Sequence, residues 1–241
     1  MARELGLSEL PDGLGIMVRF DGPRSLADLT SAVHTVCAEA ESRAKPTVVV
    51  LSFDALSADC REWPGKVDVQ QVNRWERAVR RLERLPVVSI AMLRGTCGGP
   101  TLDLLLAADF RIGSSDVRLL LPVNAEHFWP GMAVHRLVQH LGVARARQLV
   151  LWGTDIPLEK ALDLGLIDHV DDDTDEAVRT AAILTGRVSG REMAVRRQLL
   201  QEAASAEYDD ALGAHLAACD RELRRLRGLT GDLPVAVTER P

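Results

Sequence analysis

The stretch PVVSIAMLRGTCGGPTLDLLLAADFRIGSSDVRLLLPVNAEHFWPGMAVHR, residues 86–136, decides the fold, because a buried strand, a glycine turn and a helix start follow one another in it. Residues 87–93 are apolar, rich in β-branched side chains and too few for an independent helix. This pattern predicts a strand buried on both faces. Glycines within residues 95–99 predict a turn, and Pro100 suits the first helical position, so we expect a short buried helix over 101–108.

The predicted helix start has a chemical implication. Its first N–H groups lack partners within the helix and point back at the glycine turn. Such an end can stabilise a negative oxygen or a phosphate. An ordinary strand–turn–helix packing junction has the same local pattern, so the turn alone leaves both interpretations open.

The preceding residues predict the other strands and helices of an α/β core. Apolar patterns indicate strands over 14–20 and 47–52 with an amphipathic helix over 26–44 between them, which implies a parallel pair with a crossover connection. Helical spacing returns over 69–85.

Downstream, an acidic cluster over 171–175 marks a surface turn, and the composition beyond it favours helices. We therefore predict an α/β core over 1–174, a C-terminal helical region over 175–228 and a tail over 229–241.

Composition limits the function classes. The chain has 241 residues, 46% of them apolar, and a net charge of −6, which argues against a surface built to bind nucleic-acid phosphates. Its four cysteines form no C-x-x-C pair, so they suggest neither a zinc cluster nor a disulfide framework. The sequence shows no secretory pattern and no apolar run near the roughly 20 residues of a membrane span. These features predict a cytoplasmic protein.

Several ordered motifs resemble the crotonase (enoyl-CoA hydratase/isomerase) superfamily. They are Gly95, Gly98-Gly99, Asp103-Leu104 and Asp109-Phe110-Arg111-Ile112, then Leu121-Pro122, Pro130-Gly131 and Arg136-Leu137, and finally residues 151–157 and 161–168. The resemblance implies an α/β fold, the crotonase-like repeated β-β-α superhelix with a C-terminal helical region. It also implies that this region packs over subunit interfaces in a homotrimer or hexamer.

The resemblance further implies an acyl-CoA thioester as substrate, with coenzyme A entering as part of it and with no metal or redox cofactor. Crotonase-type enzymes stabilise an enolate with two backbone N–H groups. The resemblance places one donor at Cys60. The usual second donor coincides with Pro100, which has no N–H, so Gly99 or Thr101 must replace it.

Proton transfer is the second requirement of that chemistry, and hydration or dehydration needs a proton donor and an acceptor. The resemblance matches Asp103 to the first family acid, whereas Val123 stands where hydratases carry a second glutamate. Glu126 or His127 is a candidate replacement, or both form only a polar rim. For Asp103, the helix end lowers the pKa while burial raises it.

Three further sites have alternative interpretations. Arg24 and Ala58 match positions that touch coenzyme A in relatives, although Arg24 equally suits a solvent-facing turn. Cys97 with His127 or His135 could form a Cys–His nucleophile, but a lone cysteine in an apolar turn is more often a packing residue.

Residues 119–153 also resemble a narrower group, the auxiliary crotonase-type proteins of 3,5-dihydroxyphenylacetyl-CoA formation in glycopeptide-antibiotic pathways. This predicts a lyase-like protein that assists dehydration or isomerisation of a polyketide-derived thioester, with a type III polyketide synthase and a second crotonase as partners. The alternative is a non-catalytic partner that activates or stabilises the synthase. Thioester hydrolysis is a weaker third reading.

Overall fold

The computed structural model describes residues 6–20, 24–43, 48–54, 63–124, 126–153, 155–185 and 190–227. These residues form two compact units, 1–194 and 195–241. The predicted division after residue 174 falls inside the first unit, because the helix that begins there buries its apolar face against the sheet of that unit. No helix of the described residues is long and apolar enough to cross a membrane.

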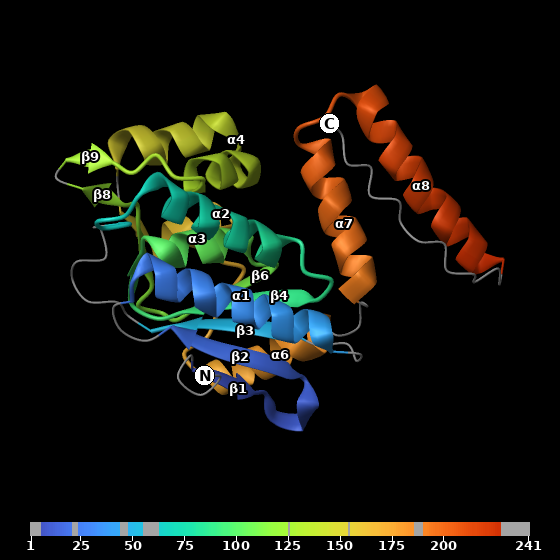
Figure 1. The fold of residues 1–241 in the computed structure, drawn as a ribbon, viewed down its shortest axis with the longest axis horizontal. Coiled ribbons are helices and arrows are strands. Elements are labelled where there is room, and N and C mark those ends of the chain that lie inside the picture. Colours follow the sequence, from blue (N-terminus) through green and yellow to red (C-terminus); the bar gives the residue numbers. More distant parts are fainter. Residues whose placement is uncertain are drawn as a thin grey trace. The chain divides into compact units, whose positions relative to one another are not determined.

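The first unit is built on a six-stranded sheet in the order β1-β2-β3-β4-β6-β11 (Figure 1). Its strands are β1 (Leu7–Glu9), β2 (Gly15–Phe20), β3 (Val48–Phe53), β4 (Val88–Leu93), β6 (Phe110–Gly113) and β11 (His169–Val170). All neighbours in it pair in parallel except β1 and β2. Every residue of β3 and of β4 is buried, as continuous apolar runs predict for a sheet covered on both faces.

Helices cover both faces of this sheet (Figure 1). One face packs against α1 (Leu26–Ser42), α2 (Val69–Glu83) and α3 (Pro100–Ala107), and the other packs against α6 (Thr174–Thr185). Side chains cap the first turns of α1 and α2. Ser25 caps α1 by accepting from the Asp28 N–H, and Asp68 and Gln71 form a reciprocal capping box at α2.

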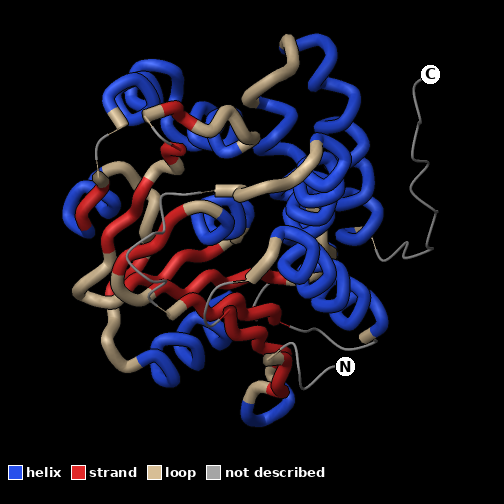
Figure 2. The backbone as a smooth tube through the Cα atoms, turned by 60° about the vertical axis from the view of Figure 1, so that its left-hand side comes forward, coloured by secondary structure: helices blue, strands red, loops and turns tan. Residues whose placement is uncertain are grey.

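Smaller strands and helices complete the first unit (Figure 2). A three-stranded sheet has the order β10-β7-β5, and β8 pairs with β9. The bounds are β5 (Thr96–Gly98), β7 (Arg118–Leu120), β8 (Val123–Asn124), β9 (His127–Phe128), β10 (Ile156–Pro157), α4 (Ala133–Trp152) and α5 (Leu158–Asp163), with a 3-10 turn at Pro11–Gly13. Along the chain, β4 belongs to the six-stranded sheet, β5 to the three-stranded sheet, and α3 follows them. This order is one β-β-α repeat.

The C-terminal region is helical, as predicted. α7 (Gly190–Ala203) crosses from the first unit into the second, and α8 (Tyr208–Leu226) lies wholly in the second. α8 has no buried residue, and four of its leucines are exposed: Leu212, Leu216, Leu223 and Leu226.

Candidate functional site

The glycine turn and the helix start form the corner that the sequence predicts. β4 ends at Leu93, and α3 begins at Pro100. One difference is that residues 96–98 are a strand, β5, which pairs in parallel with β7. The periodicity could not show this strand, because three residues are too few for a pattern. Gly99, the N-cap residue of α3, has φ 54°, a conformation that side chains rarely adopt.

Trp63 packs directly over Gly99. A Cβ added at Gly99 would lie 3.1 Å from both Cβ and Cγ of Trp63. The Trp63 ring also meets Trp75 edge-on, with ring centroids 5.7 Å apart. The corner is therefore closed on this side by two aromatic rings, a contact that the sequence did not reveal.

Gly99→Ala is expected to destabilise the protein by about 1–3 kcal/mol, because the new methyl group both strains the backbone and presses on Trp63. Gly165→Ala is the matched control, since Gly165 has φ 65° but nothing within 4 Å of an added Cβ. Urea unfolding of both variants measures the difference. Equal losses would show that the contact with Trp63 contributes nothing.

Asp103 lies in the first turn of α3 and is 3% exposed. Trp75 Nε1 donates a hydrogen bond to Asp103 Oδ2 at 2.9 Å, and Arg136 Nη1 approaches Oδ1 at 3.5 Å. The second contact is at the long limit of a hydrogen bond. The carboxyl group is thus held firmly through one oxygen and loosely through the other.

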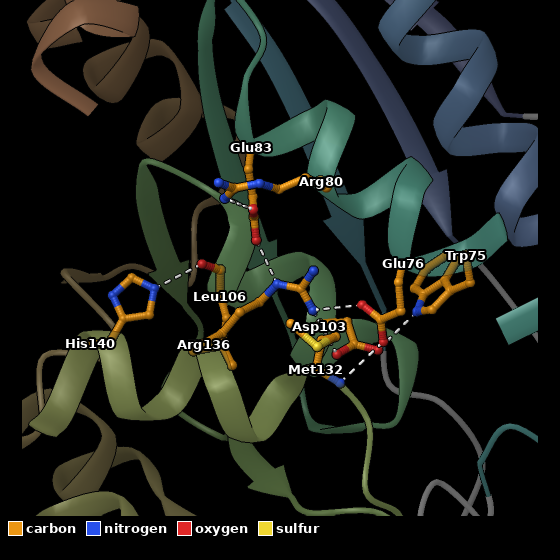
Figure 3. Close-up of polar contacts among 9 residues, drawn as sticks. All are labelled: Trp75, Glu76, Arg80, Glu83, Asp103, Leu106, Met132, Arg136 and His140. Atoms are coloured by element: carbon orange, nitrogen blue, oxygen red, sulfur yellow. Dashed lines mark hydrogen bonds and ion pairs between the residues drawn. The ribbon is translucent and has the colours of Figure 1, made fainter. Parts of the chain in front are cut away.

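Arg136 joins Asp103 to two glutamates of α2 (Figure 3). It lies in the first turn of α4, and its side chain is 8% exposed. Its Nε donates to Glu83 Oε1 at 2.5 Å, and its Nη1 donates to Glu76 Oε2 at 3.1 Å. One buried guanidinium group therefore holds three carboxyl groups from two helices.

The helices of the site are also joined through two further contacts. Glu76 Oε1 accepts from the Met132 backbone N–H at 3.2 Å, and His140 Nε2 lies 2.9 Å from the Leu106 carbonyl oxygen. Burial lowers the pKa of His140, so the ring is neutral near pH 7 and its Nε2–H donates to that carbonyl. These contacts fix α4 against both α2 and α3.

The sequence leaves open whether the helix end or burial has the larger effect on the pKa of Asp103, and in the structure it is burial. It raises the pKa of Asp103 to about 7, and the negative charge of Glu76 adds to the rise, while Arg136 and the Trp75 hydrogen bond offset only part of it. Glu83 differs. Burial raises its pKa, but Arg136 and Arg80 outweigh burial and bring the pKa below its usual value. Of Asp103 and Glu83, only Asp103 therefore has a pKa that lets it exchange a proton near neutral pH.

The other predicted acid–base residues do not join this group. Val123 lies in β8, and Glu126 and His127 belong to the β8–β9 hairpin. Both Glu126 and His127 are exposed, and Glu126 has φ 72° in the turn. Within the part of the chain that the structure describes, no hydrogen bond or ion pair connects either of them to Asp103.

Of the other predicted site residues, the structure describes Thr101, Arg24 and Cys97. Thr101 is 1% exposed in the first turn of α3, and Arg24 is half-buried just before α1. Cys97 is fully buried in β5, where its Sγ lies 3.5 Å from the Arg94 carbonyl oxygen, and this placement favours a packing role. Cys60 and Ala58 lie outside the described residues.

Sequence reasoning missed Trp75 and Glu76 as neighbours of Asp103, and Glu83 as a structural partner of Arg136. Trp75 shows only as one apolar position of an amphipathic helix, and the two glutamates lie in an arginine-rich run that resembles a solvated face. One signal was present. Glu76 and Glu83 are seven residues apart, so they share a helix face, and Trp75 precedes the first of them.

Comparison with known proteins agrees with this architecture. The enoyl-CoA hydratase/isomerase family profile matches residues 57–226. An Amycolatopsis orientalis protein named enoyl-CoA-hydratase is 41% identical over 211 residues, which cover 87% of this chain and 96% of that protein.

Two solved structures show the same fold. An enoyl-CoA hydratase from Shewanella pealeana ATCC 700345 has a TM-score of 0.76 at 18% identity, covering 92% of this chain and 89% of that one. A Thermobifida fusca YX protein in complex with acetoacetyl-CoA has a TM-score of 0.74 at 23% identity, covering 93% and 98%. The extent of the profile match and the 41% identity together establish that this chain belongs to the enoyl-CoA hydratase/isomerase family, the crotonase superfamily.

Proposed function

We propose that the chain binds an acyl-CoA thioester at the corner between β5 and α3 and assists dehydration or isomerisation of a polyketide-derived thioester. Because residues 119–153 resemble the auxiliary crotonase-type proteins, we propose that the pathway product is 3,5-dihydroxyphenylacetyl-CoA, a precursor of dihydroxyphenylglycine. The observation that carries the proposal is Asp103, a buried carboxyl group whose pKa of about 7 suits both giving and taking a proton at neutral pH. The acetoacetyl-CoA bound by the Thermobifida fusca relative supports the thioester class.

The corner supplies the rest of the chemistry in this proposal. Negative charge develops on the thioester oxygen when the α-proton leaves, and backbone N–H groups aimed at that oxygen stabilise the enolate. Gly99 or Thr101 supplies one such donor and Cys60 the other, while Arg24 and Ala58 contact the coenzyme A portion. The reaction so written uses no metal and no redox cofactor.

Asp103→Asn tests the catalytic proposal. The amide keeps the shape of the carboxyl group but cannot exchange a proton, so turnover of β-hydroxyacyl-CoA thioesters is expected to fall by about a hundredfold or more. Formation of the enoyl product measures turnover, and calorimetric titration measures thioester binding. Asp163→Asn, at an exposed position of α5, is the matched control. Equal turnover by the parent and the Asp103 variant would refute the assignment of Asp103.

A second function has its own supporting observation. Both oxygens of Asp103 are engaged within the protein and the side chain is 4% exposed, as expected for a structural carboxyl group. Pro100 and Val123 replace two family groups that act in catalysis. The second proposal is therefore a non-catalytic partner that activates or stabilises a type III polyketide synthase, alongside a second crotonase.

The two functions separate in one assay. If the parent and Asp103→Asn raise the product yield of the synthase equally, the partner function is supported. If only the parent turns over the thioester, the catalytic function is supported. We also propose assembly into a homotrimer or hexamer in the cytoplasm, and the exposed leucines of α8 support self-association.

A further inference from the structure

Dehydration of a β-hydroxyacyl thioester needs two proton-transferring groups, and Val123 removes the usual second one. The described residues bring another carboxylate to Asp103. Arg136 Nη1 contacts Glu76 Oε2 at 3.1 Å and Asp103 Oδ1 at 3.5 Å. Because both oxygens meet the same nitrogen, they cannot lie farther apart than the sum of those two distances. Glu76 and Asp103 are therefore close enough to act on one small group.

The two carboxyl groups have different surroundings. The Glu76 side chain is 16% exposed and accepts from two N–H donors, Arg136 Nη1 and the Met132 backbone. The Asp103 side chain is 4% exposed, and the one contact of its Oδ1 with the described residues is the long one with Arg136, which leaves that oxygen able to carry a proton. Paired carboxyl groups in unlike environments can divide into an acid and a base.

Among the described residues, the other titratable groups of this cluster do not offer this arrangement. Glu83 is bound to Arg136 Nε and to Arg80 Nη1, so two cations neutralise it at the far end of the guanidinium group. His140 is neutral and bound to the Leu106 carbonyl oxygen. Glu76 is thus the carboxylate of α2 that shares a nitrogen with Asp103 (Figure 3).

We propose, building on the proposed thioester function, that Glu76 is the second carboxylate of this site and removes the α-proton of the substrate while Asp103 protonates the leaving hydroxyl group. The Cα–H bond breaks and the proton passes to Glu76. The electron pair of that bond forms the new Cα–Cβ double bond, the Cβ–O bond breaks, and the Asp103 proton joins the departing oxygen to give water. Glu76 then loses its proton to solvent and Asp103 regains one, so the net change is loss of water.

The test compares Glu76→Gln with Glu83→Gln. Both glutamines keep the helix and can still accept from Arg136, but only the first removes the proposed base. With 3-hydroxybutyryl-CoA in deuterated water, Glu76→Gln is expected to lose α-proton exchange and dehydration by about a hundredfold or more, at unchanged thioester affinity. Glu83→Gln is expected to lose less than tenfold. Glu76→Asp should recover part of the exchange.

A second readout does not depend on turnover. Removing the Glu76 charge should lower the pKa of Asp103, which carbon-13 NMR of labelled aspartate measures directly.

Every outcome of these measurements bears on the proposal. A parent that binds the thioester but exchanges no α-proton would overturn the assignment of Glu76 and leave binding intact. A parent that does not bind the thioester would overturn the proposed function as well. Equal exchange by the parent and Glu76→Gln would overturn the Glu76 assignment alone.

Discussion

Arg136→Met is expected to lower the free energy of unfolding by about 3–5 kcal/mol. The guanidinium group contacts Glu76, Glu83 and Asp103, and its side chain is 8% exposed. Methionine fills a similar volume but leaves buried carboxylates without their cation, and an uncompensated buried charge is far costlier than the loss of a surface ion pair. Chemical denaturation followed by circular dichroism measures the change.

Arg145→Met is the matched control for this prediction. Arg145 is exposed and lies in α4 beyond the break at Gly142, so its replacement is expected to change stability by no more than about 0.5 kcal/mol. If the two variants were equally stable, the cluster around Arg136 would not hold α2, α3 and α4 together. A further loss of thioester binding in Arg136→Met alone would connect the cluster to the proposed site.

The stability of the protein is expected to fall as pH rises from about 4 to about 7, through Asp103. Its pKa is near 3.8 in an unfolded chain and about 7 in the folded one, so in this window the folded state binds the extra proton. In this window the unfolded chain has already lost the proton that the folded state still holds, so each rise in pH favours the unfolded state until Asp103 ionises near pH 7. One such group contributes at most about 1.4 kcal/mol per pH unit, and its effect levels off above pH 7.

Asp103→Asn isolates this contribution because it lacks the titration. The stability of the variant relative to the parent should rise between about pH 4 and about pH 7 and then stay constant. Other groups titrate in both proteins and largely cancel in the difference. Glu83, for example, has a lowered pKa, so its own contribution is lost as pH falls. A stability difference that does not change with pH would contradict a raised pKa for Asp103.

The sequence predicted the local structure around the site well. The β4 strand, the glycine turn and the α3 helix lie where the apolar run, Gly99 and Pro100 predict them. Each depends on neighbours in the sequence, such as a proline that suits the first helical turn. The family motif also pointed to Asp103, whereas no hydrogen bond or ion pair of the described residues joins it to Glu126 or His127, which stay predictions.

The placement of Glu126 and His127 depends on local pairing that the sequence did not show. The family resemblance offered them as candidate acid–base groups or as a polar rim, and the structure places both, exposed, at the short β8–β9 hairpin. Hairpin pairing over two residues has no periodic signature. Conversely, an arginine-rich helix that resembles a solvated surface supplies Trp75, Glu76 and Glu83 to the buried cluster, because α2 turns that face toward α3 and α4.

The sequence by itself determined the core strands β2, β3 and β4, the helices α1, α2 and α3 between and after them, the parallel crossover from β2 to β3, the position of Asp103 and the resemblance to the family. Periodicity, caps and ordered motifs are properties of neighbouring residues, so they can be read without coordinates. Only the tertiary structure decided that the pKa of Asp103 is raised and that Arg136 holds Glu76 and Asp103 close together. Burial and charge contacts depend on which helices pack together in space. Residues 76, 103 and 136 are too far apart in the chain for their spacing to predict that they meet.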